Sequence, residues 1–171
     1  EMIGALKESG VRVPSGFATT ATAYRAFIDA NALETPIREH LDQLVSGDAP
    51  LSEVGAAIRA RILDGAMPDA IADAIRSAYE TLSAEYQSDA VDVAARSSAT
   101  AEDLPEASFA GQQETYLNVR GVEEVLDACR KCYASLFTDR AIAYRTEKEF
   151  DHMDVALSVG IQKMVRADKA G

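Results

Sequence analysis

The segment 96–115 carries most of the residues that could do chemistry in this chain. It combines Arg96 and Thr115 with several hydroxyl side chains, small residues and Gly111. Small residues let backbone N–H groups approach a ligand, and N–H groups and hydroxyls bond phosphate oxygens. A guanidinium at the end of the preceding strand would add a two-pronged phosphate donor. The composition favours phosphate binding and a surface loop with Arg96 in a structural ion pair about equally.

The histidines and cysteines give a weaker signal. His40 and His152 lie far apart in the sequence, and neither has a second histidine or a cysteine at the spacing of a metal site. We interpret both as solvated surface residues. Cys129 and Cys132 form a C-x-x-C pair inside an amphipathic helical pattern, with no second pair to complete a zinc site. The sequence therefore predicts buried structural thiols and no metal-ligating residues.

The elements that must position these residues change in character near residue 89. Residues 1–88 are mainly helical, and Gly/Pro breakers separate helices that we expect at 21–30, 36–45, 51–63 and 68–84. Residues 89–171 are mixed, with strands expected at 91–95, 116–119 and 155–165 and helices at 122–137 and 139–148. The predicted class is α+β, with Arg96 at the end of a strand and the segment 96–115 as a long loop.

Composition limits the classes of protein. The 171 residues include 47% hydrophobic ones and carry a net charge of −11. No apolar run approaches the roughly 18 residues of a membrane span. The acidic balance disfavours general nucleic-acid binding but permits one phosphorylated small molecule at a local cationic site. We expect a cytoplasmic protein without membrane or nucleic-acid partners. Because the chain starts within an amphipathic pattern without an initiator Met, we expect a piece of a longer protein.

Several runs of sequence resemble one known family. The segments 95–105 (ARSSATAEDLP) and 107–115 (ASFAGQQET) closely resemble the nucleotide-binding domain of the phosphoenolpyruvate synthase (pyruvate, water dikinase) family. The similarity extends over nearly the whole chain through 13–20, 134–145 and 155–165. It implies an ATP-grasp-like fold, in which ATP lies between two lobes. The chain 1–171 would be an incomplete portion of that one domain.

The resemblance also implies a reaction in which ATP, pyruvate and water give AMP, phosphoenolpyruvate and phosphate. In that family, this domain holds Mg²⁺ and ATP while a histidine on another domain of the same polypeptide attacks the β-phosphorus. Pyruvate then accepts a phosphoryl group on a third, barrel domain. Both of those domains, and the acidic metal ligands, are expected outside this chain. The resemblance is compatible with a homodimer of the full-length protein and does not fix its oligomeric state.

Four residues match functional positions of the family. Arg96 corresponds to the catalytic arginine that clamps the ATP phosphates and offsets charge in the transition state. Gly111 and Thr115 match loop positions over the nucleotide, and Gln162 matches a residue near the adenine and ribose. Three alternatives stay open: a rifamycin phosphotransferase with the same ATP domain, a more distant glucan, water dikinase, and a non-catalytic nucleotide-binding module.

Overall fold

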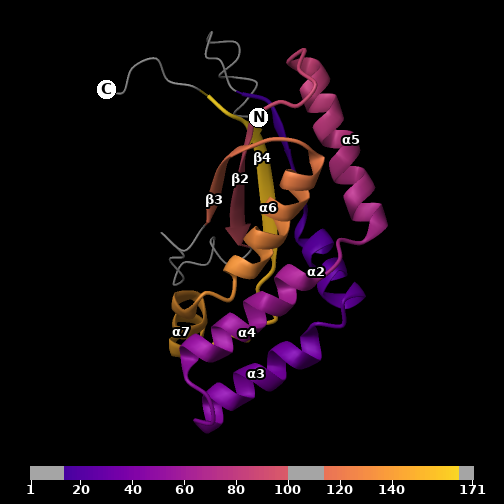
Figure 1. Cartoon of the computed structure of the whole chain (residues 1–171). Coiled ribbons are helices and arrows are strands. Elements are labelled where there is room, and N and C mark those ends of the chain that lie inside the picture. Colours follow the sequence, from indigo (N-terminus) through magenta and orange to yellow (C-terminus); the bar gives the residue numbers. More distant parts are fainter. Residues whose placement is uncertain (1–13, 100–113, 166–171) are drawn as a thin grey trace, which may run out of the picture.

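A four-stranded antiparallel sheet is the centre of the molecule (Figure 1). The computed structural model describes residues 14–99 and 114–165. Within these ranges the strand order is β1-β4-β2-β3. The strands are β1 (Gly16–Ala18), β2 (Val93–Ala99), β3 (Thr115–Val119) and β4 (Leu157–Lys163). The first and last described strands pair with each other, so the sheet joins the helical half of the chain to the mixed half.

Local signals account for the helices. These are α2 (Ala21–Ala30), α3 (Glu34–Ser46), α4 (Leu51–Asp64), α5 (Asp69–Glu85), α6 (Val122–Ser135) and α7 (Asp139–Glu147). The Ala23 N–H donates to the Thr20 hydroxyl and caps α2, and Thr138 caps α7 in the same way. Gly47 ends α3 with φ 81°, a left-handed conformation that glycine adopts without steric cost. These boundaries agree with the predicted helices to within a few residues.

The core lies between one face of the sheet and the helices. Alternate residues of β2 and β4, including Val93, Ala95, Val159 and Ile161, are buried. Helix α6 crosses this face, and α4 packs on α6 in turn (Figure 1). Alternation therefore fixes which residues of each strand point away from the core.

The strand β2 is longer than the sequence predicts. It continues through Ala99, which pairs with Leu157, whereas the apolar pattern predicted an end at residue 95. Ser97 looks unlike a strand residue, yet it is buried and its N–H donates to the Glu114 carbonyl over 3.1 Å. Pairing on both sides thus extends a strand whose own side chains are polar. Arg96 lies within β2 and not at its end, which corrects the expectation that it begins a loop.

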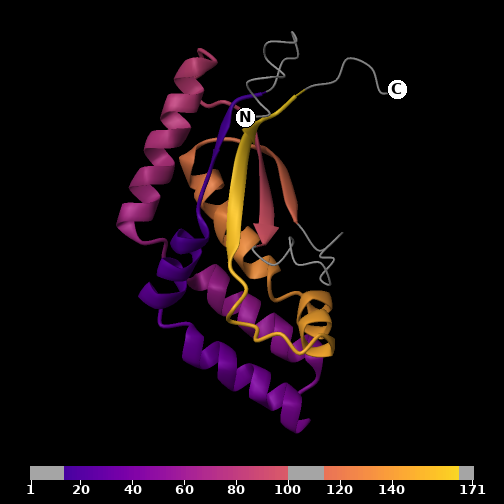
Figure 2. The ribbon, with the colours of Figure 1, turned by 180° about the vertical axis from the view of Figure 1, so that it is seen from behind.

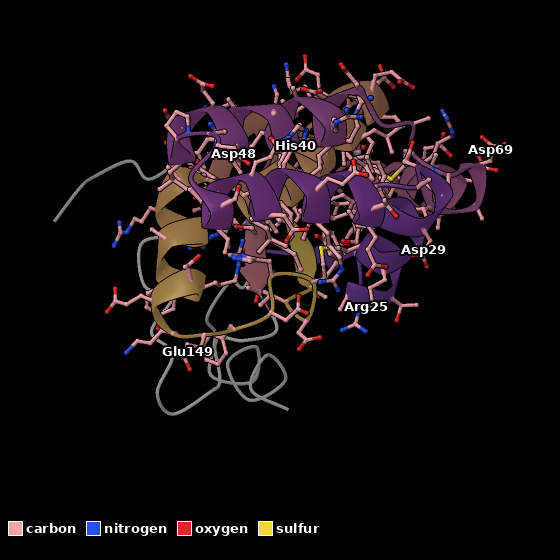
Figure 3. All side chains as sticks on the ribbon, turned by 90° about the horizontal axis from the view of Figure 1, so that it is seen from below. Arg25, Asp29, His40, Asp48, Asp69 and Glu149 are labelled. Atoms are coloured by element: carbon pink, nitrogen blue, oxygen red, sulfur yellow. The ribbon has the colours of Figure 1, made fainter. Side chains whose placement is uncertain are left out.

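Helices α2, α3 and α4 lie at one end of the molecule (Figure 1). Seen from this end, charged residues are exposed at the surface: Arg25, Asp29 and Asp48, together with Asp69 at the start of α5 and Glu149 after α7 (Figure 3). In the stretches of the chain that are described, no helix combines the length and the apolar character needed to cross a membrane.

Candidate functional site

The face of the sheet opposite α6 carries the polar residues singled out above. In Figure 2, β4 and β2 lie in front of α6, and no helix of the described residues covers this face. Strand alternation places Arg96 of β2 on it, together with Gly160 and Gln162 of β4. Arg96 is directly opposite Gly160 across the β2–β4 ladder.

A concavity of about 400 Å³ lies on this face. It brings together Arg96 and Gln162, which are far apart in the sequence. Its other lining residues are small or apolar: Pro14, Gly16, Phe17, Ala18, Gly160 and Ile161. The concavity therefore has one cationic side chain and one amide side chain in a largely uncharged surface.

Arg96 is the only charged residue that lines this concavity among the described residues. Its side chain is exposed, and it forms no ion pair within the ranges 14–99 and 114–165. The nearby cation Lys163 differs, because it is paired with Asp92. A guanidinium with free donors beside an uncharged surface suits a phosphate group, which accepts two parallel N–H bonds.

The Gln162 side chain is held in place by the segment that leads into β1. Its side-chain Nε2 donates to the Pro14 carbonyl over 3.3 Å. Gly16 lies directly opposite Gln162 in the β1–β4 ladder, so no side chain separates the amide from this edge of the concavity. A terminal amide in such a position can both donate and accept hydrogen bonds.

Thr115 begins β3 directly opposite Arg96 on the other side of β2. It is exposed and shares the open face with Arg96. The preceding residue, Glu114, is fixed to β2 because its N–H donates to the Ser97 hydroxyl over 3.0 Å. The structure thus brings Thr115 next to Arg96. Gly111 lies outside the described residues.

The cysteines and His152 contribute to the packing of the fold and do not line the concavity. Cys129 and Cys132 are free and buried, as predicted, and burial raises the pKa of Cys129 to about 12. His152 is half-buried and corrects the expectation of a solvated residue: its Nδ1 accepts a bond from Arg145 Nε over 2.9 Å. Burial and the Arg145 charge lower its pKa to about 4. No group of three or more metal-ligating side chains occurs in the described ranges.

The sequence interpretation missed Gly160 and Ala18, which lie side by side on the floor of the concavity. The signal for Gly160 was present, since a glycine inside a strand often marks the close approach of a ligand or another backbone. For Ala18 there was none, because its place depends on the pairing of β1 with β4.

Comparisons with known proteins agree on one family. All of residues 1–171 match the model of the pyruvate phosphate dikinase AMP/ATP-binding domain. The chain is 57% identical to a phosphoenolpyruvate synthase of Synechocystis over 99% of its length and 21% of the relative. It is 53% identical to a phosphoenolpyruvate synthase of Aquifex aeolicus (98% of this chain, 20% of the relative). It is 50% identical to a phosphoenolpyruvate synthase of Escherichia coli (99% of this chain, 21% of the relative). The chain spans about a fifth of these relatives.

Proposed function

The chain belongs to the pyruvate phosphate dikinase AMP/ATP-binding domain family, and on that premise we propose that it is the ATP-binding portion of a phosphoenolpyruvate synthase. The complete enzyme converts ATP, pyruvate and water into AMP, phosphoenolpyruvate and phosphate. A histidine on another domain attacks the β-phosphorus of ATP and AMP leaves. Water removes the terminal phosphate, and the phosphoryl group left on the histidine passes to pyruvate.

One observation carries this proposal. Arg96 and Gln162, matched separately to phosphate and nucleoside positions of the family, line the same concavity. Thr115 shares their face and lies directly opposite Arg96. Arg96 would bind the phosphates through paired N–H donors, and Thr115 and Gly111 would add bonds from the segment that follows β2. Gln162 would contact the adenine or ribose.

The roles of these residues follow from their charge and position. The phosphates gain negative charge at the leaving and equatorial oxygens during transfer, and a fixed guanidinium stabilises that charge without reorganisation. The open sheet would form one wall of an ATP-grasp-like cleft. The opposing lobe, the phosphohistidine domain and the pyruvate site would lie elsewhere on the polypeptide, so that 1–171 is a portion of one ATP-binding domain.

Magnesium does not fit the described residues as a site of its own. Mg²⁺ prefers several oxygen ligands, often carboxylates and phosphates. The described ranges hold no cluster of three acidic or other metal-ligating side chains. Nor does a carboxylate among the described residues line the concavity next to Arg96. We therefore assign no magnesium ligand to the described ranges of this chain.

The proposal is tested on the full-length polypeptide by phosphorus NMR of Mg²⁺ and ATP with pyruvate. We expect AMP, inorganic phosphate and phosphoenolpyruvate to appear together. ATP that stays intact with pyruvate would contradict the synthase. In that case a rifamycin is tried as acceptor, because a rifamycin phosphotransferase would share this ATP domain. ATP binding without turnover on any acceptor would indicate a non-catalytic module.

A further inference from the structure

Within the described ranges, nothing in the fold requires a glycine at position 160. It lies inside β4, between partners in β1 and β2, and glycine in a strand interior costs stability. Among the atoms of the described residues, a Cβ at Gly160 would meet only the Arg96 carbonyl oxygen, 3.9 Å away. Its φ is also outside the left-handed region. Neither backbone conformation nor described neighbours explain the missing side chain.

Gly16 on the neighbouring strand provides the contrast. A Cβ there would lie 2.3 Å from the Ile161 carbonyl oxygen and 2.9 Å from the Gln162 Cα. Backbone atoms cannot give way cheaply, so packing requires glycine at position 16. The two glycines line the same concavity, but only Gly16 has a reason in the described protein.

The location of Gly160 indicates what the space is for. It lies directly between Arg96 of β2 and Ala18 of β1, on the floor of the concavity. We propose that Gly160 keeps this floor free of side-chain atoms so that the nucleoside of the bound nucleotide lies against β4. This inference rests on the proposed function, because it assumes a nucleotide in this site.

The chemistry of the rim favours the nucleoside over the phosphates above Gly160. Pro14 contributes apolar atoms and Gln162 an amide, which suit a planar base and a sugar. The Phe17 side chain packs against the core, because Phe17 lies opposite the buried Ile161. On the β2 side of the concavity, Arg96 supplies a positive charge that suits the phosphates. A valine at position 160 would place three carbon atoms where the nucleoside rests.

The experiment compares Gly160→Val with the wild type in the full-length enzyme. The dissociation constants of ATP and of inorganic tripolyphosphate are measured by calorimetry. We expect Gly160→Val to raise the dissociation constant of ATP about tenfold or more, because the added side chain would overpack a close contact. We expect tripolyphosphate, which has no nucleoside, to keep its affinity within about twofold.

Two further variants separate a local effect from damage to the sheet. Ser158→Val adds an apolar side chain on the same face of β4 but outside the concavity, and we expect both affinities to stay within about twofold. Hydrogen exchange of β4 amides reports the stability of the strand. Protection should be unchanged or higher in Gly160→Val, because valine favours strands. It should fall in Gly16→Val, where the side chain would clash with backbone.

The outcomes distinguish this inference from the function on which it rests. A wild-type enzyme that binds neither ATP nor tripolyphosphate overturns both. If the wild type binds ATP and Gly160→Val binds it equally well, the role of Gly160 is wrong and the proposed function stands. An equal loss of ATP and tripolyphosphate in Gly160→Val also overturns the role, because the substitution would then act on the phosphate side.

Discussion

Two arginines in this protein lie in opposite environments. Arg96 is exposed on the open face of the sheet and has no ion pair among the described residues. Arg145 of α7 has no exposed surface. Its Nη2 donates to the Leu136 carbonyl, its Nε donates to His152 over 2.9 Å, and its cation lies 5.4 Å from the centre of the Phe137 ring. Burial lowers the pKa of Arg145 to about 10.

The contrast shows what each guanidinium is for. The Nε and Nη2 donors of Arg145 join the end of α6 to α7 and to the turn that contains His152, so the fold uses these two donors. Its Nη1 is buried and has no partner among the described residues. The guanidinium of Arg96 lies beside a concavity and has no acidic partner within 14–99 and 114–165, so it is available to a ligand. Substitutions at the two sites should therefore affect different properties: stability at Arg145, and nucleotide chemistry at Arg96.

The largest effect is expected for Arg145→Met. It removes the bond to the Leu136 carbonyl and leaves a buried acceptor unpaired, so the free energy of unfolding should fall by about 3 kcal/mol or more. Native-state hydrogen exchange of α6 and α7 amides in the full-length protein measures it. The matched control, Arg96→Met, should change the same quantity by less than about 0.5 kcal/mol. An equal loss at both positions would remove the distinction between the two arginines.

The next effect concerns catalysis. Arg96→Ala in the full-length enzyme should lower the rate of AMP formation by about 100-fold or more, because a fixed charge-stabilising donor is lost. Arg96→Lys keeps the charge without the two-pronged geometry. Its rate of AMP formation should lie between those of the alanine variant and the wild type. The measurement is AMP release with saturating ATP and pyruvate. Unchanged turnover in Arg96→Ala would contradict the phosphate role.

A smaller effect on stability is expected at a third arginine. Arg59 of α4 is partly exposed and paired: its Nη1 donates to the Phe137 carbonyl over 2.7 Å and to Asp139 over 3.0 Å. Asp139→Asn weakens only the charged component of this contact, so the free energy of unfolding should fall by about 1 kcal/mol or less. The loss should shrink in high salt. If Asp139→Asn lowered the free energy of unfolding as much as Arg145→Met, burial would not be what makes the Arg145 contacts more stabilising than those of Arg59.

The smallest effect at neutral pH concerns His152. Burial and Arg145 lower its folded pKa to about 4 from an ordinary 6.5, so the unfolded chain binds a proton first as pH falls. The contribution of the neutral, buried His152 to the free energy of unfolding is fully present above pH 6.5. It is lost as the pH drops toward about 4. His152→Gln should flatten this dependence. Hydrogen exchange of α7 amides at pH 7 and at pH 5 tests it, and an identical slope in the variant would contradict it.

Much of the fold could be predicted because its signals are local. Thr20 and Thr138 cap their helices through a residue three positions on, and Gly47 ends α3 through its own φ. The prediction of strand β2 was less accurate. Its extension to Ala99 depends on pairing with Leu157, which no short window of sequence contains. The wrong interpretation of His152 has the same origin, because its burial is set by tertiary packing.

The sequence by itself determined the family, through a motif around Arg96 that is specific in residue type and order. It also determined that Arg96, Thr115 and Gln162 are the described candidates for nucleotide contacts. Only the tertiary structure decided that the three lie on one face. A shift of one residue in the β2–β4 pairing would not change the motif, but it would move Gln162 to another position relative to Arg96. Long-range strand register, which no local pattern encodes, therefore decided the geometry of the site and the free space above Gly160.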